Sequence, residues 1–406
     1  MKTNRADTKR RRPGIAGAVL AAVTALASGA ATAATFPELY TVTVDSAQAC
    51  GIGDAARRTQ VARLGLPKLL TRITGGSEAA GDPEILQRLL SNTQALVTSC
   101  SNEQGGRMQI GFNPATVTGV LTDLGWPIWS EDRPATLLWI AADLGGGERA
   151  ELMAAEGDPA RRVRAIAGVA GAASNPLPPA AEAAFDGVVA ELLLAADDRG
   201  LPLVLPRLDA EDRQHVRFAD VWGGFDRFVA RAAERYDVDA VLIGRVDLTA
   251  ASPAVDWILL RGERRQARPG SSLRAGIDWL ADQFASEYRI VGDARLSWIT
   301  VRRIETFSDQ MRVEEYLNSV RVFESVELEE SSDGEYLWRV IFRGDDAQIR
   351  QILGLGGVLV PPGAPRGQRG QRGLPGPPGP LTADEDEGRM VFVPAWRADP
   401  DSPGLP

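Results

Sequence analysis

The 406-residue sequence is poor in the side chains that most enzymes and metal proteins need, with one histidine and two cysteines. His215 has no cysteine or histidine partner at the spacing of a metal-ligand set, so no metal site is predicted. A serine nucleophile would have to use this histidine, and the Gly-x-Ser-x-Gly motif is missing. The glycines at 145–147 lack the Lys-Ser or Lys-Thr of a phosphate-binding loop. We expect no cofactor, and a non-catalytic role is favoured.

The sequence also has no excess of basic residues. Lysine and arginine number 45 against 54 acidic residues, and the formal net charge is −9. Phosphate binding draws on concentrated lysine and arginine, so we expect no nucleic-acid partner. The same balance argues against unspecific adhesion to anionic lipid.

The chain has one long apolar run, at residues 15–27, and it follows a basic start. The basic residues are Lys2, Arg5, Lys9, Arg10, Arg11 and Arg12. Ala31-Thr32-Ala33 fits a signal-peptidase site, so we expect residues 1–34 to be a signal peptide cleaved near Ala33 or Ala34. An uncleaved amino-terminal anchor is the alternative. The predicted location is the periplasm, with no transmembrane segment after cleavage.

Cys50 and Cys100 would meet an oxidising compartment after export, where disulfides form and persist. We predict one bridge between them. Two buried free thiols, which behave as small hydrophobes, are the alternative. Either role is structural.

Residues 35–130 read as a small N-terminal α/β unit. A strand is predicted at 39–45, followed by a helix that Pro67 should kink or shorten, a second helix at 83–90 and a hairpin across Gly105-Gly106. Asn113-Pro114 predicts a further helix start, which Gly125 would match as a stop.

Residues 131–290 alternate apolar strands with amphipathic helices, which predicts a central three-layer α/β domain with a largely parallel sheet. Within it, residues 154–180 are rich in Ala, Gly and Pro and are predicted to be a mobile insertion. Residues 291–360 follow the order β-α-β-β-α of a ferredoxin-like split unit, a common recognition module. Residues 361–406 form a Pro/Gly-rich tail predicted to be disordered, with five glycines in a collagen-like register.

The densest polar segment follows the predicted strand at 203–205. Its candidate residues are the carboxylates Asp209, Glu211, Asp212 and Asp220, with Arg207 and Trp222 as binding candidates. Ligands commonly bind at the carboxyl end of a strand in an α/β sheet. The alternative is a capped, solvated helix start, in which Asp209 accepts backbone N–H bonds and the arginines form surface ion pairs.

Several sequence segments together resemble the bacterial secreted family described as domain of unknown function 2066. They are residues 39–44, 70–75, 125–129 with Arg133-Pro134, 199–206 with Leu208-Asp209 and Glu211-Asp212, and 235–245. The resemblance covers about residues 36–355 and implies a secreted protein of Gram-negative bacteria, without an activity or catalytic residues. The cysteine pair, the 154–180 insertion and the tail depart from the family pattern. Residues 236–246 are also similar to a phrase of outer-membrane accessory lipoproteins, an analogy that suggests an envelope interaction domain.

Two functions follow as hypotheses. The first is a periplasmic, non-catalytic binding or envelope-assembly accessory factor with a protein partner. The second is a periplasmic hydrolase that uses the carboxylates of residues 209–220, which would have to converge in a pocket with perturbed pKa values.

Overall fold

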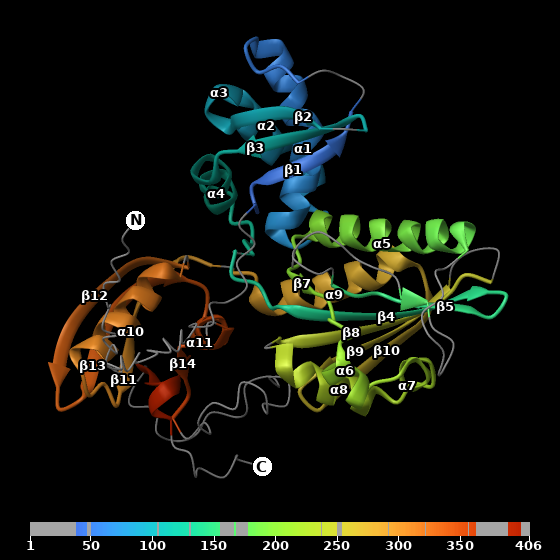
Figure 1. The fold of residues 1–406 in the computed structure, drawn as a ribbon. Coiled ribbons are helices and arrows are strands. Elements are labelled where there is room, and N and C mark those ends of the chain that lie inside the picture. The colour runs from blue at the N-terminus through green and yellow to red at the C-terminus, as the bar shows by residue number, and fades with distance from the viewer. Residues whose placement is uncertain are drawn as a thin grey trace, which may run out of the picture. The chain divides into compact units, whose positions relative to one another are not determined.

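The computed structural model describes residues 38–46, 50–103, 105–129, 131–154, 166–167, 178–236, 238–249, 254–290, 292–320, 322–355, 357–362 and 389–398. The expected signal peptide, most of the 154–180 insertion and most of the tail lie outside these ranges. Within them, no helix combines the length and the apolar character of a membrane span. The described elements form three sheets with helices packed on them (Figure 1).

The N-terminal unit is an antiparallel sheet in the order β1-β3-β2 with helices packed on it. Its elements are β1 (Thr41–Asp45), α1 (Ala55–Thr74), η1 (Ala79–Gly81), α2 (Pro83–Ser91), α3 (Thr93–Leu96), β2 (Val97–Glu103), β3 (Arg107–Phe112) and α4 (Pro114–Asp123). Gly105 and Gly106 both have positive φ, which permits the tight turn between β2 and β3. Asn113 caps α4 by accepting from the amide of Thr116, and the predicted Cys50–Cys100 disulfide is present.

Pro67 lies inside α1 and does not end it. Of the two predicted effects, a kink or a shortening, the shortening is therefore wrong. Proline removes one N–H from the helical ladder, which is costly in an isolated helix. Here Leu66, Leu69 and Leu70 on either side of it are fully buried, so core packing on this face holds the helix together.

The central domain is built on a seven-stranded sheet with the path β10-β9-β8-β4-β5-β6, and β7 also pairs with β4. Its strands are β4 (Thr136–Gly145), β5 (Glu148–Glu151), β6 (Ile166–Ala167), β7 (Leu203–Val204), β8 (Ala240–Asp247), β9 (Ala254–Arg261) and β10 (Arg264–Ser271). Its helices are α5 (Pro179–Arg199), α6 (Ala210–His215), α7 (Phe218–Trp222), α8 (Asp226–Ala233), η2 (Glu234–Tyr236) and α9 (Leu273–Tyr288).

The expectation of a largely parallel sheet is wrong. Only β4 pairs in parallel, with β8 and β7, and the remaining pairings are antiparallel. The connections explain this, because a parallel neighbour needs a crossover of a dozen or more residues. The segment between β8 and β9 and the turn between β9 and β10 are both far shorter than that. The exposed strand β10 was not predicted, since its arginines and Pro269 hide the strand pattern, but proline is tolerated on such an edge.

Helices cover both faces of this sheet, as the three-layer prediction requires (Figure 1). Helices α5 and α9 pack on one face, where Phe185 and Phe284 are fully buried. Helices α7 and α8 pack on the other, against Trp139 and Ile243, and α6 contacts α8. The segment after β7 therefore lies at the surface on the side of the sheet that α7 and α8 cover.

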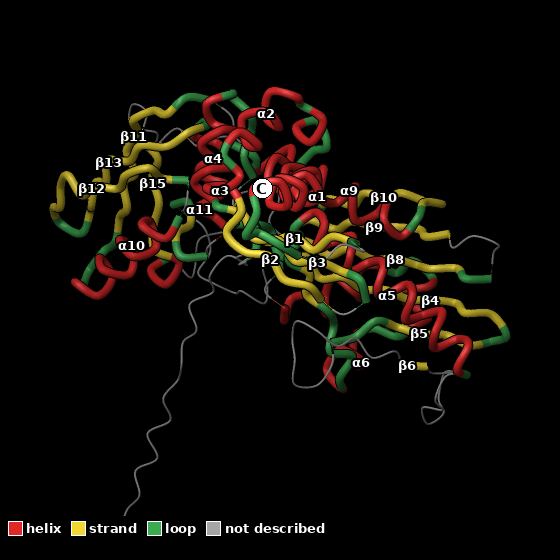
Figure 2. The backbone as a smooth tube through the Cα atoms, turned by 90° about the horizontal axis from the view of Figure 1, so that it is seen from above, coloured by secondary structure: helices red, strands yellow, loops and turns green. Residues whose placement is uncertain are grey.

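The C-terminal unit contains the predicted β-α-β-β-α order and two further strands. Its elements are β11 (Ala294–Arg302), α10 (Phe307–Ser319), β12 (Phe323–Ser332), β13 (Glu335–Arg343), α11 (Asp346–Leu355), β14 (Leu359–Val360), β15 (Arg389–Pro394) and η3 (Ala395–Arg397). The sheet order is β12-β13-β11-β15-β14, and Figure 2 shows the first four strands side by side.

Strand β15 corrects the prediction of a disordered tail for residues 389–398. It lies between β11, to which it is parallel, and β14, to which it is antiparallel. Met390 and Phe392 are buried, and they alternate with more exposed residues as a strand should. The surrounding Pro, Gly and acidic composition concealed this short apolar pattern.

The apolar core of the N-terminal unit is separate from those of the rest of the described chain. The N-terminal unit has its own core around Leu66, Ile110 and Leu121. In contrast, the core on the α5 and α9 face of the central domain runs on through Tyr288 and Ile290 into the C-terminal unit. The central domain and the C-terminal unit thus share buried apolar surface.

Candidate functional site

Asp209, the first predicted carboxylate, caps α6 and is held by Arg235. Its Oδ1 accepts from the amide of Asp212 at 3.1 Å, and the Arg235 guanidinium binds the carboxylate through both terminal nitrogens, at 2.6 and 3.0 Å. These hydrogen bonds from Arg235 lower the pKa of Asp209 to about 2. Asp209 is therefore ionised at neutral pH and cannot serve as a general acid.

Asp212 is completely buried and fixes the turn after β7. Its carboxylate accepts from the Leu208 amide at 2.8 Å, from the Tyr236 hydroxyl at 2.5 Å and from Arg235 at 3.1 Å. Leu208 has φ of 50°, a left-handed conformation that L side chains rarely adopt, and the bond to its amide stabilises it. Burial, together with the hydrogen bond to Asp212, raises the pKa of Tyr236 and keeps its hydroxyl as the donor.

The other candidates take structural positions as well. Glu211 completes the ring of carboxylates around Arg235, at 3.3 Å. Asp220 accepts from the Arg217 amide at the start of α7, and Trp222 stacks on Phe218 with ring centroids 5.7 Å apart. The backbone amide of Arg207 donates to the Tyr236 hydroxyl, while its side chain is exposed.

The structure thus brings three of the four carboxylates together around one cation, Arg235, and leaves Asp220 on α7. Arg235 and Tyr236 are the two residues that sequence reasoning did not single out. The signal in the sequence that could have pointed to them is their position at the start of segment 235–245, which carries part of the family resemblance. Three carboxylates held by a guanidinium and by capping bonds stabilise a turn, and the pKa of Asp209 is lowered rather than raised, so Asp209 is no proton donor at neutral pH.

Arg72, Arg133 and Arg199 form a buried group, here called the arginine cluster. Each comes from a different one of the sequence segments that carry the family resemblance. Their exposed fractions are 0%, 0% and 7%. Arg72 comes from α1 and donates to the Thr41 carbonyl at 2.7 Å, while Arg199 ends α5 and donates to the Gly75 carbonyl at 3.0 Å. The N-terminal unit and the central domain are therefore joined through guanidinium groups.

Arg133 is the centre of the arginine cluster. It donates to the carbonyls of Arg199 and Gly200 through one terminal nitrogen and to those of Arg72 and Trp129 through the other, at 2.7 to 3.1 Å. Its guanidinium also lies 4.0 Å from the centre of the Trp129 ring. Burial, and next the charge of Arg72, lower the pKa of Arg133 well below its ordinary value. The cluster is closed to solvent, so its role is to join the two parts.

The carboxylates of the arginine cluster lie at its solvent side. Arg199 pairs with Asp278 at 3.0 Å and Asp282 at 2.6 Å on α9, and Arg72 pairs with Asp197 at 3.1 Å. Each positive charge brought into the interior by Arg72 and Arg199 thus has a partner, as buried charges require.

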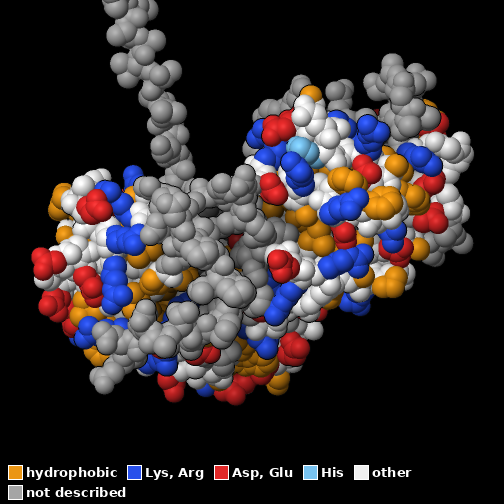
Figure 3. Space-filling model, turned by 90° about the horizontal axis from the view of Figure 1, so that it is seen from below, with side chains coloured by type: hydrophobic (Ala, Val, Ile, Leu, Met, Phe, Trp, Pro, Cys, Tyr) orange, Lys and Arg blue, Asp and Glu red, His pale blue; other side chains and the backbone are white. Residues whose placement is uncertain are grey.

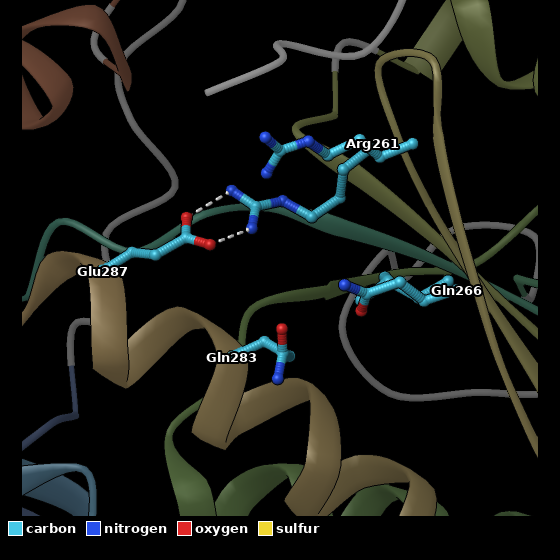
Figure 4. A pocket seen from close by; sticks show the side chains of 6 residues that line it. Arg261, Gln266, Gln283 and Glu287 are labelled. Atoms are coloured by element: carbon cyan, nitrogen blue, oxygen red, sulfur yellow. Dashed lines mark hydrogen bonds and ion pairs between the residues drawn. The ribbon is translucent and has the colours of Figure 1, made fainter. Parts of the chain in front are cut away.

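A small polar pocket lies between β9, β10 and α9 (Figure 4). Arg261 and Glu287 form a two-bond ion pair across it, at 2.6 and 2.7 Å, and Gln266 and Gln283 face the same space from β10 and α9. Its volume is about 70 Å³, room for only a few water molecules. We regard it as a polar notch at the sheet edge that is too small for an organic ligand.

A larger cavity, here called the junction cavity, has a volume of about 470 Å³. Its apolar and aromatic lining comprises Tyr40, Trp126, Ile128, Ile290 and Val322, and its charged lining comprises Glu131, Asp293, Glu324 and Arg343. Residues of α4 complete the wall on the side of the N-terminal unit. Ligand cavities span about 300–1,000 Å³ and are lined mainly by apolar and aromatic groups with a few polar ones.

On the face that Figure 3 shows, basic and acidic side chains are interspersed over the described residues, and no broad patch of one sign stands out. Strands β12 and β13 form ion pairs across their boundary, since Arg339 of β13 pairs with Glu329 of β12 and Arg343 with Glu324. Across the described ranges, no group of histidine, cysteine and acidic side chains could hold a metal ion.

Comparison with protein families finds one match, over residues 33–130, to a family described as domain of unknown function (DUF8605). This range coincides closely with the N-terminal unit. It is a domain of unknown function, as the resemblance implied, but it carries a different number and covers only this part of the chain. No curated protein and no solved structure matches the chain. Residues 33–130 are therefore similar to DUF8605.

Proposed function

We propose that this protein is an exported, non-catalytic binding protein that acts as an accessory factor in the envelope of a Gram-negative bacterium. In this proposal it binds a protein partner at the junction cavity. The cavity is the single observation that carries the proposal, because at about 470 Å³ it is much the roomier of the two pockets described above.

The walls of the junction cavity support binding rather than chemistry. Tyr40, Trp126 and Ile128 supply apolar and aromatic surface from the N-terminal side, and Ile290 and Val322 supply it from the other. Aromatic and aliphatic anchors buried in such a pocket contribute most of the energy of protein interfaces. Among the lining residues that the structure describes there is no histidine or cysteine, so histidine-based and thiol chemistry lacks its usual groups there.

Export is supported by the sequence. The basic start, the apolar run at 15–27 and the Ala31-Thr32-Ala33 site form a secretory signal, and the resemblance to the secreted family of domain of unknown function 2066 over residues 36–355 agrees with it. The Cys50–Cys100 bridge suits an oxidising compartment. The hydrolase hypothesis has no comparable support, because Asp209 and Asp212 are both bound to Arg235.

Site-specific photocrosslinking in the source bacterium tests the proposal. A photoreactive amino acid replaces Thr122 in the cavity wall, and a matched one replaces Leu194, an exposed residue of α5 outside the cavity. We expect one recurrent protein adduct in the envelope fraction from the Thr122 position and none from Leu194. Adducts that are absent, or equal from both positions, would contradict the proposal, and recovery of the protein in the cytoplasm would contradict export.

A further inference from the structure

We infer that the free edge of β10 binds an extended acidic segment of a partner protein, which adds to the central sheet as a further strand. The segment pairs with the backbone of residues 264–268 and places its acidic side chains beside Arg264 and Arg268. This surface is separate from the junction cavity, so the inference goes beyond the proposed function.

Strand β10 is an edge strand of the central sheet. Its one neighbour among the described strands is β9, and Figure 2 shows β10 as the outermost strand on that side. It is eight residues long, and residues 264–270 are all exposed, so the edge is open to solvent. An open edge of this length presents unpaired N–H and C=O groups to which another extended chain can add.

The register between β9 and β10 indicates which backbone groups point outward. Residues 262–263 form a two-residue turn, and Arg264 pairs with Arg261 directly after it. In such a hairpin the two residues that flank the turn bond to each other, and bonded and unbonded positions then alternate along the strand. The N–H and C=O groups of Arg265 and Ala267 therefore point away from β9.

The side chains beside this edge carry positive charge that is not matched. Arg264 and Arg268 lie on the same face of the sheet as Gln266, which points into the polar notch beside α9 (Figure 4). Neither of these two arginine side chains forms an ion pair or a hydrogen bond with any residue that the structure describes. Arg265 lies on the opposite face and pairs with Asp226, so it adds no net charge.

The acidic groups near the edge do not cancel both arginines. Glu287 is bound to Arg261 by two hydrogen bonds, at 2.6 and 2.7 Å. Glu263 is exposed in the turn, next to Arg264 in sequence, whereas Arg268 lies near the other end of the strand. A carboxylate on an added strand is therefore attracted at both arginines, more strongly at Arg268, and can bond to the guanidinium through two N–H groups.

Other occupants of the edge are disfavoured. A second copy of the chain would bring its own Arg264 and Arg268 to the same edge, where like charges on neighbouring strands repel. Pro269 has no N–H and is the next outward position after Ala267, so pairing with an added strand ends there. The edge thus suits a short extended segment, and its charge selects an acidic one.

The direct test is calorimetric titration of the full exported chain with three acetylated and amidated heptapeptides. The first is Thr-Glu-Val-Thr-Val-Glu-Thr, whose two glutamates have the same spacing as Arg264 and Arg268. The second carries lysine in place of both glutamates, and the third is the first with an N-methyl group on each valine. We expect binding of the first peptide alone, because lysine reverses the charge and N-methylation removes the donors that face β10.

Matched variants locate the interaction on β10. Arg264→Gln together with Arg268→Gln should weaken binding of the first peptide about tenfold or more, because both ion pairs are lost. The control Arg57→Gln with Arg63→Gln removes two exposed arginines of α1 and should leave affinity within about twofold. Ala267→Pro removes an outward N–H and should abolish binding with an unchanged circular dichroism spectrum, because proline is tolerated at such an edge position. Ala267→Thr keeps the N–H and should keep the binding.

Equal binding of the glutamate and lysine peptides, or equal weakening by the β10 and control arginine variants, would overturn the inference. Unchanged binding of the N-methylated peptide would do so too, because the contact would then need no added strand. If amides in place of the four acidic residues at 384–387 strengthened peptide binding about tenfold, the occupant would be this segment of the chain itself.

A dimer in sedimentation that Ala267→Pro abolishes would assign the edge to a second copy and overturn the inference as well. The outcome for the proposed function is separate, because crosslinks from Thr122 report on the junction cavity and not on β10.

Discussion

Arg133 offers the sharpest test of how this chain is held together. Four hydrogen bonds from its guanidinium reach carbonyl groups at and just beyond the ends of α1 and α5 and in the segment that follows α4. Helix ends leave their last carbonyls without partners, and a positive charge near two helix C-termini is also favourable. We predict that Arg133→Met strongly lowers the free energy of unfolding, because methionine has no donor for these carbonyls.

The magnitude follows from two opposing effects. Each buried carbonyl that loses a charged donor costs about 1–3 kcal/mol, and four are involved. Removing the guanidinium recovers the cost of burying its charge, which is several kcal/mol. The net loss should be about 3–5 kcal/mol, as for other buried charged groups whose partners are left behind. Arg133→Lys should also destabilise, because an ammonium cannot reproduce the planar two-nitrogen arrangement.

Urea unfolding followed by tryptophan fluorescence and circular dichroism measures this loss. The control is Arg274→Met on α9, where the arginine is 49% exposed and pairs with Asp198 and Asp278. A surface pair of this kind contributes about 0–1 kcal/mol. If Arg133→Met cost less than about 1 kcal/mol, or no more than the control, the arginine cluster would not be what joins the N-terminal unit to the central domain.

Three further predictions concern other contacts. Replacing both Cys50 and Cys100 by alanine should lower the free energy of unfolding by about 2–4 kcal/mol, since the bridge closes a loop of 50 residues, and a reductant should destabilise the parent protein but not the variant. Phe392→Ala should cost about 3–5 kcal/mol because the ring is buried in β15, whereas the exposed neighbour Arg389→Ala should change stability by less than about 0.5 kcal/mol, and equal effects would contradict the placement of β15. Burial alone would raise the pKa of Asp309, but hydrogen bonds from Trp396, Thr306 and Arg397 lower it to about 2. This carboxylate therefore contributes about 2 kcal/mol that is fully present above pH ~4 and is lost as the pH falls through ~2. Asp309→Asn should flatten the acid limb of an unfolding profile measured between those values, and an unchanged limb would refute the assignment.

Local signals in the sequence predicted much of this architecture. Asn113-Pro114 starts α4, and Gly200 ends α5 in a left-handed conformation. The β-α-β-β-α order of the C-terminal unit and the Cys50–Cys100 pairing were also predicted. These features depend on steric preferences and hydrogen bonds between near neighbours, or on there being a single possible pair of cysteines, and a sequence carries that information directly.

The tertiary structure alone decided which distant segments meet. It turned β9 and β10 antiparallel, placed β15 beside β11, and set Asp209 and Asp212 around Arg235. It also brought Arg72, Arg133 and Arg199 together from three separate segments of the sequence. The junction cavity likewise is formed by residues that are far apart in the chain. The physical reason is that strand order, ion pairing and cavities depend on long-range packing. The single histidine and the two cysteines predicted a protein without familiar catalytic groups, and only the packed chain shows where its junction cavity lies.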